Sequence, residues 1–95
     1  MLDRETAQKL VEEEINRSYT TPGDRLVIQE EETIEKEYGW IFFYTSQRFL
    51  ETGDVNHMLA GNAPIVVDRR TGTLTPLGTA EPFENYLRRY EESMT

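Results

Sequence analysis

The side chains best suited to catalysis are sparse in this sequence. His57 is the one histidine among the 95 residues, and it lies in a polar stretch, so we expect it to face solvent rather than act as a general base. The chain has no cysteine and therefore no disulfide, thiolate nucleophile or thiolate zinc ligand. The acidic residues do not follow a calcium-loop pattern, and no glycine motif for phosphate binding is present. The residues therefore predict no enzyme, no metal and no cofactor.

The aromatic stretch "EYGWIFFYTS" (Glu37 to Ser46) could in principle stack on nucleic-acid bases. Such stacking surfaces lie in basic grooves, whereas this stretch follows the acidic segment "EEETIEKE". We therefore expect this stretch to form a buried strand. The alternative is that one of its rings stays partly exposed and anchors a protein interface. Alternation places Trp40, Phe42 and Tyr44 on one face and Ile41 and Phe43 on the other, so both faces are apolar.

The charge and length of the chain indicate which partners, how many domains and which location to expect. The 18 acidic and 10 basic residues give a net charge of −8, which repels nucleic acid and anionic lipid and favours encounter with basic partners. We expect one domain over residues 1–95, because this length supports a single core. The start "MLDRETAQKL" is charged and resembles no secretion signal, and no apolar stretch approaches a membrane span. These features predict a cytoplasmic protein that does not enter the membrane.

Two amphipathic helices are expected near the ends of the chain. After Asp3, a plausible N-cap, one apolar stripe is formed by Ala7, Leu10, Val11 and Ile15. After Pro82, the second stripe is formed by Phe83, Tyr86, Leu87 and Tyr90. Each helix must bury its stripe against another layer of the fold.

Four strands are predicted between these helices. The first covers Arg25–Glu30, and the second is the aromatic stretch. A hairpin then joins Ile65–Val67 to Thr73–Leu77, and Pro76 places the last strand at a sheet edge or ends it. Between the two pairs, Asp54 could cap a short helix. We therefore predict an α+β fold: a four-stranded antiparallel sheet packed by an N-terminal and a C-terminal amphipathic helix, in the order α-β-β-loop/short helix-β-β-α.

Several residues are assigned to structure rather than to chemistry. Glycine and proline positions at turns and strand starts are expected to set the backbone. The large aromatics of the second strand and of the last helix are expected to supply the core. The structural set is Gly39, Gly61, Pro64, Gly72, Trp40, Phe42, Phe43, Tyr44, Tyr86 and Tyr90.

Longer motifs resemble a known family. "GWIFFY" (39–44) and "GNAPIVVD-x-x-TG" (61–72), with "LETGD" (50–54) and "GTAEPFENYLRRY" (78–90), occur at the spacings of the immunity protein 35 family, also called YrhB-like. The resemblance covers nearly the whole chain and is strongest from Tyr38 onward. It implies a small, non-enzymatic protein that binds and neutralises a cognate bacterial toxin domain of a polymorphic toxin system. It carries no catalytic residue set.

Binding residues are expected in the polar segments, because loops carry binding while strands carry packing. These segments are Glu30–Glu37 and Gln47–Asn62. The candidate contacts to the partner are Glu31, Glu32, Glu35, Glu37, Arg48, Glu51, Asp54, His57 and Asn62.

Three alternatives stay open. One branch of the resembled family is chaperone-like, so the protein could instead hold aggregation-prone polypeptides, for which an exposed apolar patch is needed. A small enzyme would require His57 beside an activating carboxylate in a pocket. A homodimer is compatible with the sequence but is not determined by it.

Overall fold

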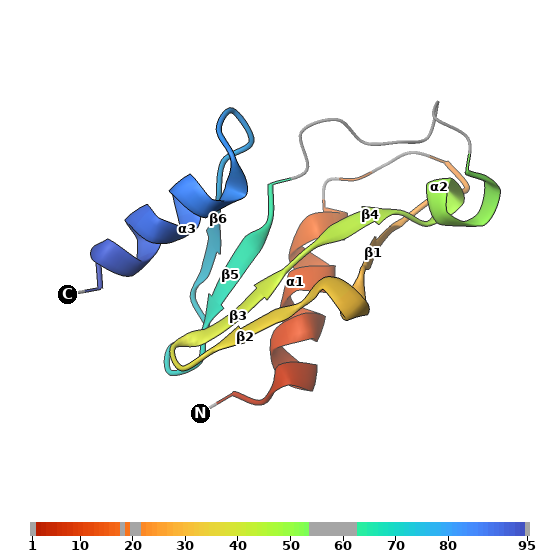
Figure 1. Ribbon diagram of the computed structural model, residues 1–95. Coiled ribbons are helices and arrows are strands. Elements are labelled where there is room, and N and C mark those ends of the chain that lie inside the picture. The colour runs from red at the N-terminus through yellow and green to blue at the C-terminus, as the bar shows by residue number, and fades with distance from the viewer. Residues whose placement is uncertain (1, 18, 20–21, 54–62, 95) are drawn as a thin grey trace.

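Within residues 2–17, 19, 22–53 and 63–94, which the computed structural model describes, three α-helices surround short β-strands (Figure 1). The predicted α+β class, with a four-stranded antiparallel sheet and helices near both chain ends, is confirmed. No helix in these ranges is long and apolar enough to cross a bilayer. In chain order the elements are α1 Arg4–Arg17, β1 Leu26–Ile28, the 3-10 helix η1 Glu30–Glu32, β2 Ile34–Lys36, β3 Gly39–Phe42, β4 Tyr44–Ser46, α2 Gln47–Thr52, β5 Ile65–Asp68, β6 Leu74–Pro76 and α3 Phe83–Glu92.

The four-stranded sheet has the order β2-β3-β5-β6, with antiparallel neighbours. The prediction that Arg25–Glu30 supplies one of its strands is wrong, because β1 pairs with β4 in a separate two-stranded sheet. The fourth strand is β2, within the polar stretch Glu30–Glu37. An edge position tolerates these charges. At the other edge, β6 ends at Pro76, which fits the missing N–H of that residue.

A three-residue insertion separates the two sheets. Ile28 lies opposite Tyr44, and Ile34 lies opposite Ile41. Between these two pairs the β1–β2 side advances by six residues, whereas the β3–β4 side advances by only three. The three extra residues correspond in number to η1, Glu30–Glu32. The segments β1–η1–β2 and β3–β4 thus form one long hairpin from which η1 bulges.

One face of the strands is covered by α1. Ala7, Val11 and Ile15 are buried, and they pack in one cluster with Trp40 and Phe42. Tyr44 is partly buried against the same cluster. Complete burial of a large side chain contributes about 2–3 kcal/mol of transfer free energy, so Trp40 and Phe42 are major contributions to this layer.

The opposite face is covered by α3. Ile41, Val66 and Leu77 form its buried centre. The ring of Phe43 packs edge-on against Phe83, with a centroid distance of 5.3 Å. The predicted alternation along this strand is therefore correct, and α1 and α3 lie on opposite sides of the strands (Figure 1). The side chains of α3 that pack here are all only partly buried: Phe83, Tyr86, Leu87 and Tyr90.

A short helix, α2, precedes the stretch in which one was predicted. Helix α2 begins after Ser46, whose Oγ accepts a hydrogen bond from the Phe49 N–H, and it ends at Gly53 in a left-handed conformation. The helical turn predicted after Asp54 lies outside the described residues, as does Gly61. Pro64 is buried immediately before β5, and Gly72 has φ +75° in the β5–β6 turn.

Asp24 joins the segment after α1 to the β4–α2 junction. Its carboxylate accepts hydrogen bonds from the hydroxyls of Tyr19 and Ser46 and from the backbone N–H groups of Arg25 and Arg48. Partial desolvation by itself raises the pKa of Asp24, but these four hydrogen bonds outweigh it and hold the pKa well below its usual range. The ionised form of Asp24 therefore stabilises the fold.

Candidate functional site

An acidic edge lies on the β1–η1–β2 side of the long hairpin. It consists of four glutamates that the sequence predicted as partner contacts, and the structure places all four in exposed positions on or beside η1 and β2: Glu31, Glu32, Glu35 and Glu37. The bulge of η1 and the edge position of β2 cause this exposure, because neither segment has a further strand beside it in the sheet. Most of these carboxylates are free to meet a partner, whereas Glu35 pairs with Arg69.

The other predicted contacts do not join this edge. Arg48 and Glu51 are exposed on α2, which follows β4 and lies at the far end of the hairpin from the β2–β3 turn (Figure 1). Asp54, His57 and Asn62 lie outside the described residues. The binding role of all nine residues stays a prediction.

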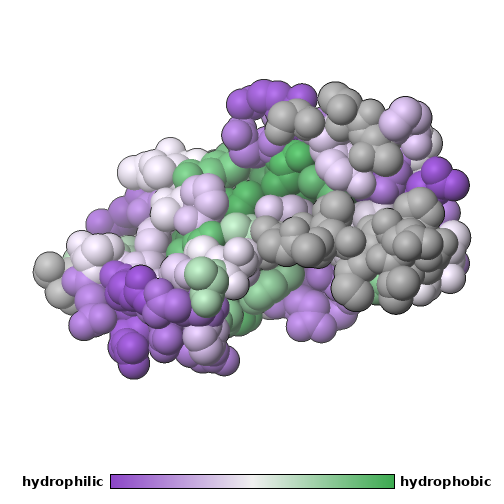
Figure 2. Space-filling model, turned by 90° about the horizontal axis from the view of Figure 1, so that it is seen from above, coloured by the Kyte–Doolittle hydropathy of each residue, from purple (hydrophilic) through white to green (hydrophobic). Residues whose placement is uncertain are grey.

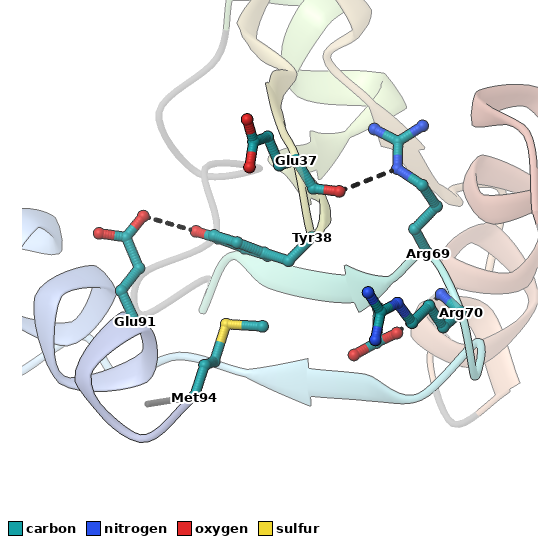
Figure 3. Close-up of a pocket in the computed structure, with 7 residues that line it drawn as sticks. Glu37, Tyr38, Arg69, Arg70, Glu91 and Met94 are labelled. Carbon is teal, nitrogen blue, oxygen red and sulfur yellow. Dashed lines mark hydrogen bonds between the residues drawn. The ribbon is translucent and has the colours of Figure 1, made fainter.

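A pocket of about 510 Å³ lies at one end of the acidic edge. We call it the turn pocket, because the β2–β3 turn and the β5–β6 turn form two of its walls and the end of α3 forms the third (Figure 3). It shares Glu37 with the acidic edge. Its lining residues are Glu37, Tyr38, Asp68, Arg69, Arg70, Glu91 and Met94.

Arg69 fixes the two turns to each other. Its guanidinium donates to the carbonyl oxygens of Lys36 (2.9 Å) and Glu37 (3.2 Å) and pairs with the Glu35 carboxylate at 3.1 Å. The same guanidinium lies over the Trp40 ring, 4.4 Å from the centroid. Its side chain is only 24% exposed, so these contacts are partly shielded from water. Arg69 is therefore occupied by the protein itself.

Tyr38 and Glu91 connect the β2–β3 turn to α3. The Tyr38 hydroxyl points toward Glu91 and donates to its Oε2 over 2.8 Å (Figure 3). Lys36 Nζ lies 3.8 Å from the same oxygen. Burial, followed by the hydrogen bond and charge of Glu91, raises the pKa of Tyr38 above its ordinary value. Tyr38 therefore stays a neutral hydrogen-bond donor and does not serve as a base.

The remaining residues of the pocket differ in their contacts and exposure. Asp68 Oδ1 accepts from the backbone N–H groups of Arg70 and Thr71, which lowers the pKa of Asp68. The side chain of Arg70 is exposed on the other side of the pocket from Glu91 (Figure 3). Met94 is 45% exposed and contributes an apolar surface to the pocket. The pocket thus combines an aromatic ring, a thioether and carboxylates.

This arrangement fits binding better than catalysis. Within the described ranges, no group of three acidic, histidine or cysteine side chains is placed to hold a metal ion. The Tyr38 hydroxyl is engaged with the Glu91 carboxylate, and the Asp68 carboxylate is engaged with turn amides, so these three groups do not form an acid–base pair poised for a substrate. An open cavity with an apolar wall and charged ends instead resembles a recognition site for a polar side chain.

The sequence did not reveal the turn pocket. The sequence predicts only that the "DRRTG" segment (68–72) connects the strands of a hairpin, and it predicts no site role for Glu91 or Met94. Their meeting with Tyr38 depends on how α3 lies on the sheet. The one usable signal was the pair of adjacent arginines in a turn of an acidic protein, because one of them faces inward and binds the neighbouring turn.

Comparison with known proteins identifies the family. The family model described as immunity protein 35 matches residues 5–93. Over 53 residues the chain is 51% identical to the uncharacterized protein YrhB of Escherichia coli (strain K12), a match that spans 56% of this chain and 56% of that relative. No solved structure matches the chain. The chain therefore belongs to the immunity protein 35 family, as its motifs indicated.

Proposed function

We propose that this protein is a non-enzymatic immunity protein that binds a cognate toxin domain and neutralises it in the cytoplasm. The observation that carries the proposal is the acidic edge, a set of exposed glutamates on or beside η1 and β2 of the long hairpin. Family membership supports a binding role in general. The neutralising activity and the identity of the toxin are the proposed steps.

The mechanism is occlusion preceded by electrostatic steering. The net charge of −8 attracts a basic toxin domain over distances up to about one Debye length, roughly 8–10 Å in physiological salt. The glutamates of η1 protrude from the sheet, so a partner reaches them without displacing other elements. Electrostatic steering raises the association rate, while buried anchors at the interface set the lifetime of the complex.

The test uses the toxin encoded beside this chain. The protein is co-expressed with that toxin, and both cell survival and the association rate of the purified pair are measured. The edge variant Glu31→Gln/Glu32→Gln/Glu37→Gln is compared with the control variant Glu5→Gln/Glu13→Gln/Glu84→Gln. Each variant removes three exposed glutamates and changes the net charge from −8 to −5.

Because both variants have the same net charge, only a local role of the edge separates them. We expect the edge variant to slow association by about 10-fold or more at low salt and the control by about 2–3-fold. Equal effects of the two variants would contradict a role for the acidic edge. Absence of any association, with cells surviving the toxin equally well without the protein, would contradict the proposed function.

A chaperone-like role is the second candidate. The observation that favours it is the apolar surface in the middle of the face seen in Figure 2, with hydrophilic residues along part of its border. A holding activity needs such a patch to extend over several hundred Å². Suppression of the aggregation of several unrelated client proteins would support this role, whereas selective binding to one toxin domain would count against it.

A further inference from the structure

Arginine side chains inside this protein are held by a recurrent arrangement of a ring and a carboxylate. Arg69 lies over Trp40 and pairs with Glu35. Arg89 lies 5.1 Å from the centroid of Tyr86 and pairs with Glu81. In both cases the flat guanidinium covers a ring face while its edge donates to a carboxylate, a geometry that lysine cannot reproduce.

The turn pocket offers the same two kinds of group, an aromatic ring and carboxylates. Tyr38 supplies the ring, and Glu91 and Glu37 supply carboxylates. Among the described residues no arginine lies over the Tyr38 ring, although Tyr90 packs against it at a centroid distance of 5.5 Å. The contacts of Glu91 with Tyr38 and with Lys36 both use Oε2, so its Oε1 is available to a guest.

The pocket also has the walls that an inserted side chain requires. Met94 lies beside the Tyr38 ring and provides an apolar surface for the stem of a long side chain (Figure 3). The volume of about 510 Å³ falls within the range of roughly 300–1,000 Å³ that is usual for binding pockets. The hydrogen bond from Tyr38 to Glu91 fixes the ring and the carboxylate before a guest arrives, which reduces the entropy lost on binding.

We propose that the turn pocket receives an arginine side chain of the protein partner, with its guanidinium on the Tyr38 ring and paired with Glu37 and Glu91. This inference rests on the proposed function for the identity of the partner as a protein. It adds to that function a specific anchor at the end of the acidic edge. Arginine is among the residue types that most often dominate interface energetics.

Arg70 and a second copy of the chain define the rival explanation. Arg70 and Glu37 have opposite charges and line the same pocket, so two copies could pair these residues across a two-fold axis. The net charge of −8 on each copy opposes this association, especially at low salt. We therefore favour the arginine of a basic partner.

The test needs no toxin. N-acetyl-arginine methylamide is titrated into the full chain, with N-acetyl-citrulline methylamide as the uncharged control of the same shape. Binding is followed by NMR through the Tyr38 ring and the Met94 methyl group, which is easily resolved because the sequence has three methionines. We expect saturable shifts at both groups with a Kd on the order of 1–10 mM, as suits a ligand of this size, and no saturable shifts with the citrulline compound.

Variants separate the pocket from general acidity. Glu37→Gln and Glu91→Gln should each weaken binding of the arginine probe by about 3-fold or more, whereas Tyr38→Phe, which keeps the ring but loses the hydrogen bond that orients Glu91, should weaken it by about 2-fold or less. Glu32→Gln removes a charge of the same sign outside the pocket and should change the Kd by less than about 2-fold. Arg70→Ala removes a competing cation and should tighten binding.

Three results would overturn the inference. These are the absence of saturable shifts at Tyr38 and Met94, equal binding of the citrulline compound, and a dimer that covers the pocket and dissociates in an Arg70→Glu variant. The outcome is distinguishable from that of the proposed function. Toxin neutralisation without probe binding defeats only the pocket assignment, whereas probe binding without any toxin association defeats only the immunity role.

Discussion

Replacing Arg69 by alanine tests whether one side chain holds the two hairpin turns together. The variant removes two hydrogen bonds to backbone carbonyls, the contact with the Trp40 ring and the pair with Glu35. The hydrogen bonds contribute about 1 kcal/mol each and the ring contact about 0.5–1 kcal/mol. The Glu35 side chain is largely exposed, so its pair adds at most about 0.5 kcal/mol.

We therefore expect Arg69→Ala to lower the free energy of unfolding by about 3 kcal/mol, which for a chain of this length lowers Tm by roughly 12–24 °C. Arg69→Lys keeps the charge but loses the planar fork, and about half of that loss should result. Arg70→Ala is the matched control. It truncates the adjacent, exposed arginine and should change stability by less than about 0.5 kcal/mol.

The assay is urea unfolding followed by far-UV circular dichroism. Tryptophan fluorescence is unsuitable as the sole probe, because Trp40 is the one tryptophan and its ring lies directly under the mutated side chain. Similar unfolding midpoints for Arg69→Ala and Arg70→Ala would refute the reasoning, since the two variants would then differ only in contacts that carry no stability.

Three further predictions concern other parts of the fold. Gly39→Ala should lower the free energy of unfolding, measured in urea, by at least about 3 kcal/mol, because Gly39 has φ +154° and an added Cβ would lie 1.8 Å from the Val67 carbonyl oxygen. Gly53→Ala, also at positive φ but with open space around it, should lower it by only about 1 kcal/mol. Equal losses in the two variants would contradict the close approach at Gly39. The low pKa of Asp24 in the folded state means that its contribution is complete above the unfolded pKa of about 3.9 and is lost as the pH falls through the folded value. Asp24→Asn should therefore destabilise the protein near neutral pH, and its urea midpoint should fall less steeply below about pH 5 than that of the unmodified protein. An equally steep fall in both proteins would contradict this role of Asp24. The raised pKa of Tyr38 predicts that its phenol ionises above the usual value of about 10, and that the associated stability is present below pH 10 and is lost as the pH rises through the folded-state pKa. Tyrosinate absorbance should show this group titrating at lower pH in Glu91→Gln. An unaltered titration curve would show that Glu91 does not raise the pKa of Tyr38.

Much of the fold could be predicted because it follows from local patterns. The helical stripes placed Ala7, Val11 and Ile15 toward the sheet, and strand alternation assigned Trp40 and Phe43 to opposite faces. The segment Ile34–Lys36 could not be assigned as a separate strand, because its two charged residues and one isoleucine show no apolar alternation. Its partner β3 supplies the ladder hydrogen bonds that make it a strand.

The acidic edge was half predictable. Composition alone indicated that Glu31, Glu32 and Glu37 would be exposed, since unpaired carboxylates are costly to bury. Their positions on a bulge and at a sheet edge depend on the three-residue shift in pairing between β1–β4 and β2–β3. That shift depends on which residues of two strands pair, a property that no single segment contains.

By itself the sequence determined the family, the α+β class, the two amphipathic helices and the acidic character, because motifs, periodicity and charge are carried by residues close together in the chain. Only the tertiary structure decided that Arg69 binds the β2–β3 turn and that Tyr38 meets Glu91, 53 positions apart in the chain. The physical reason is that a pocket depends on distances between elements, and those are fixed when α3 packs on the sheet.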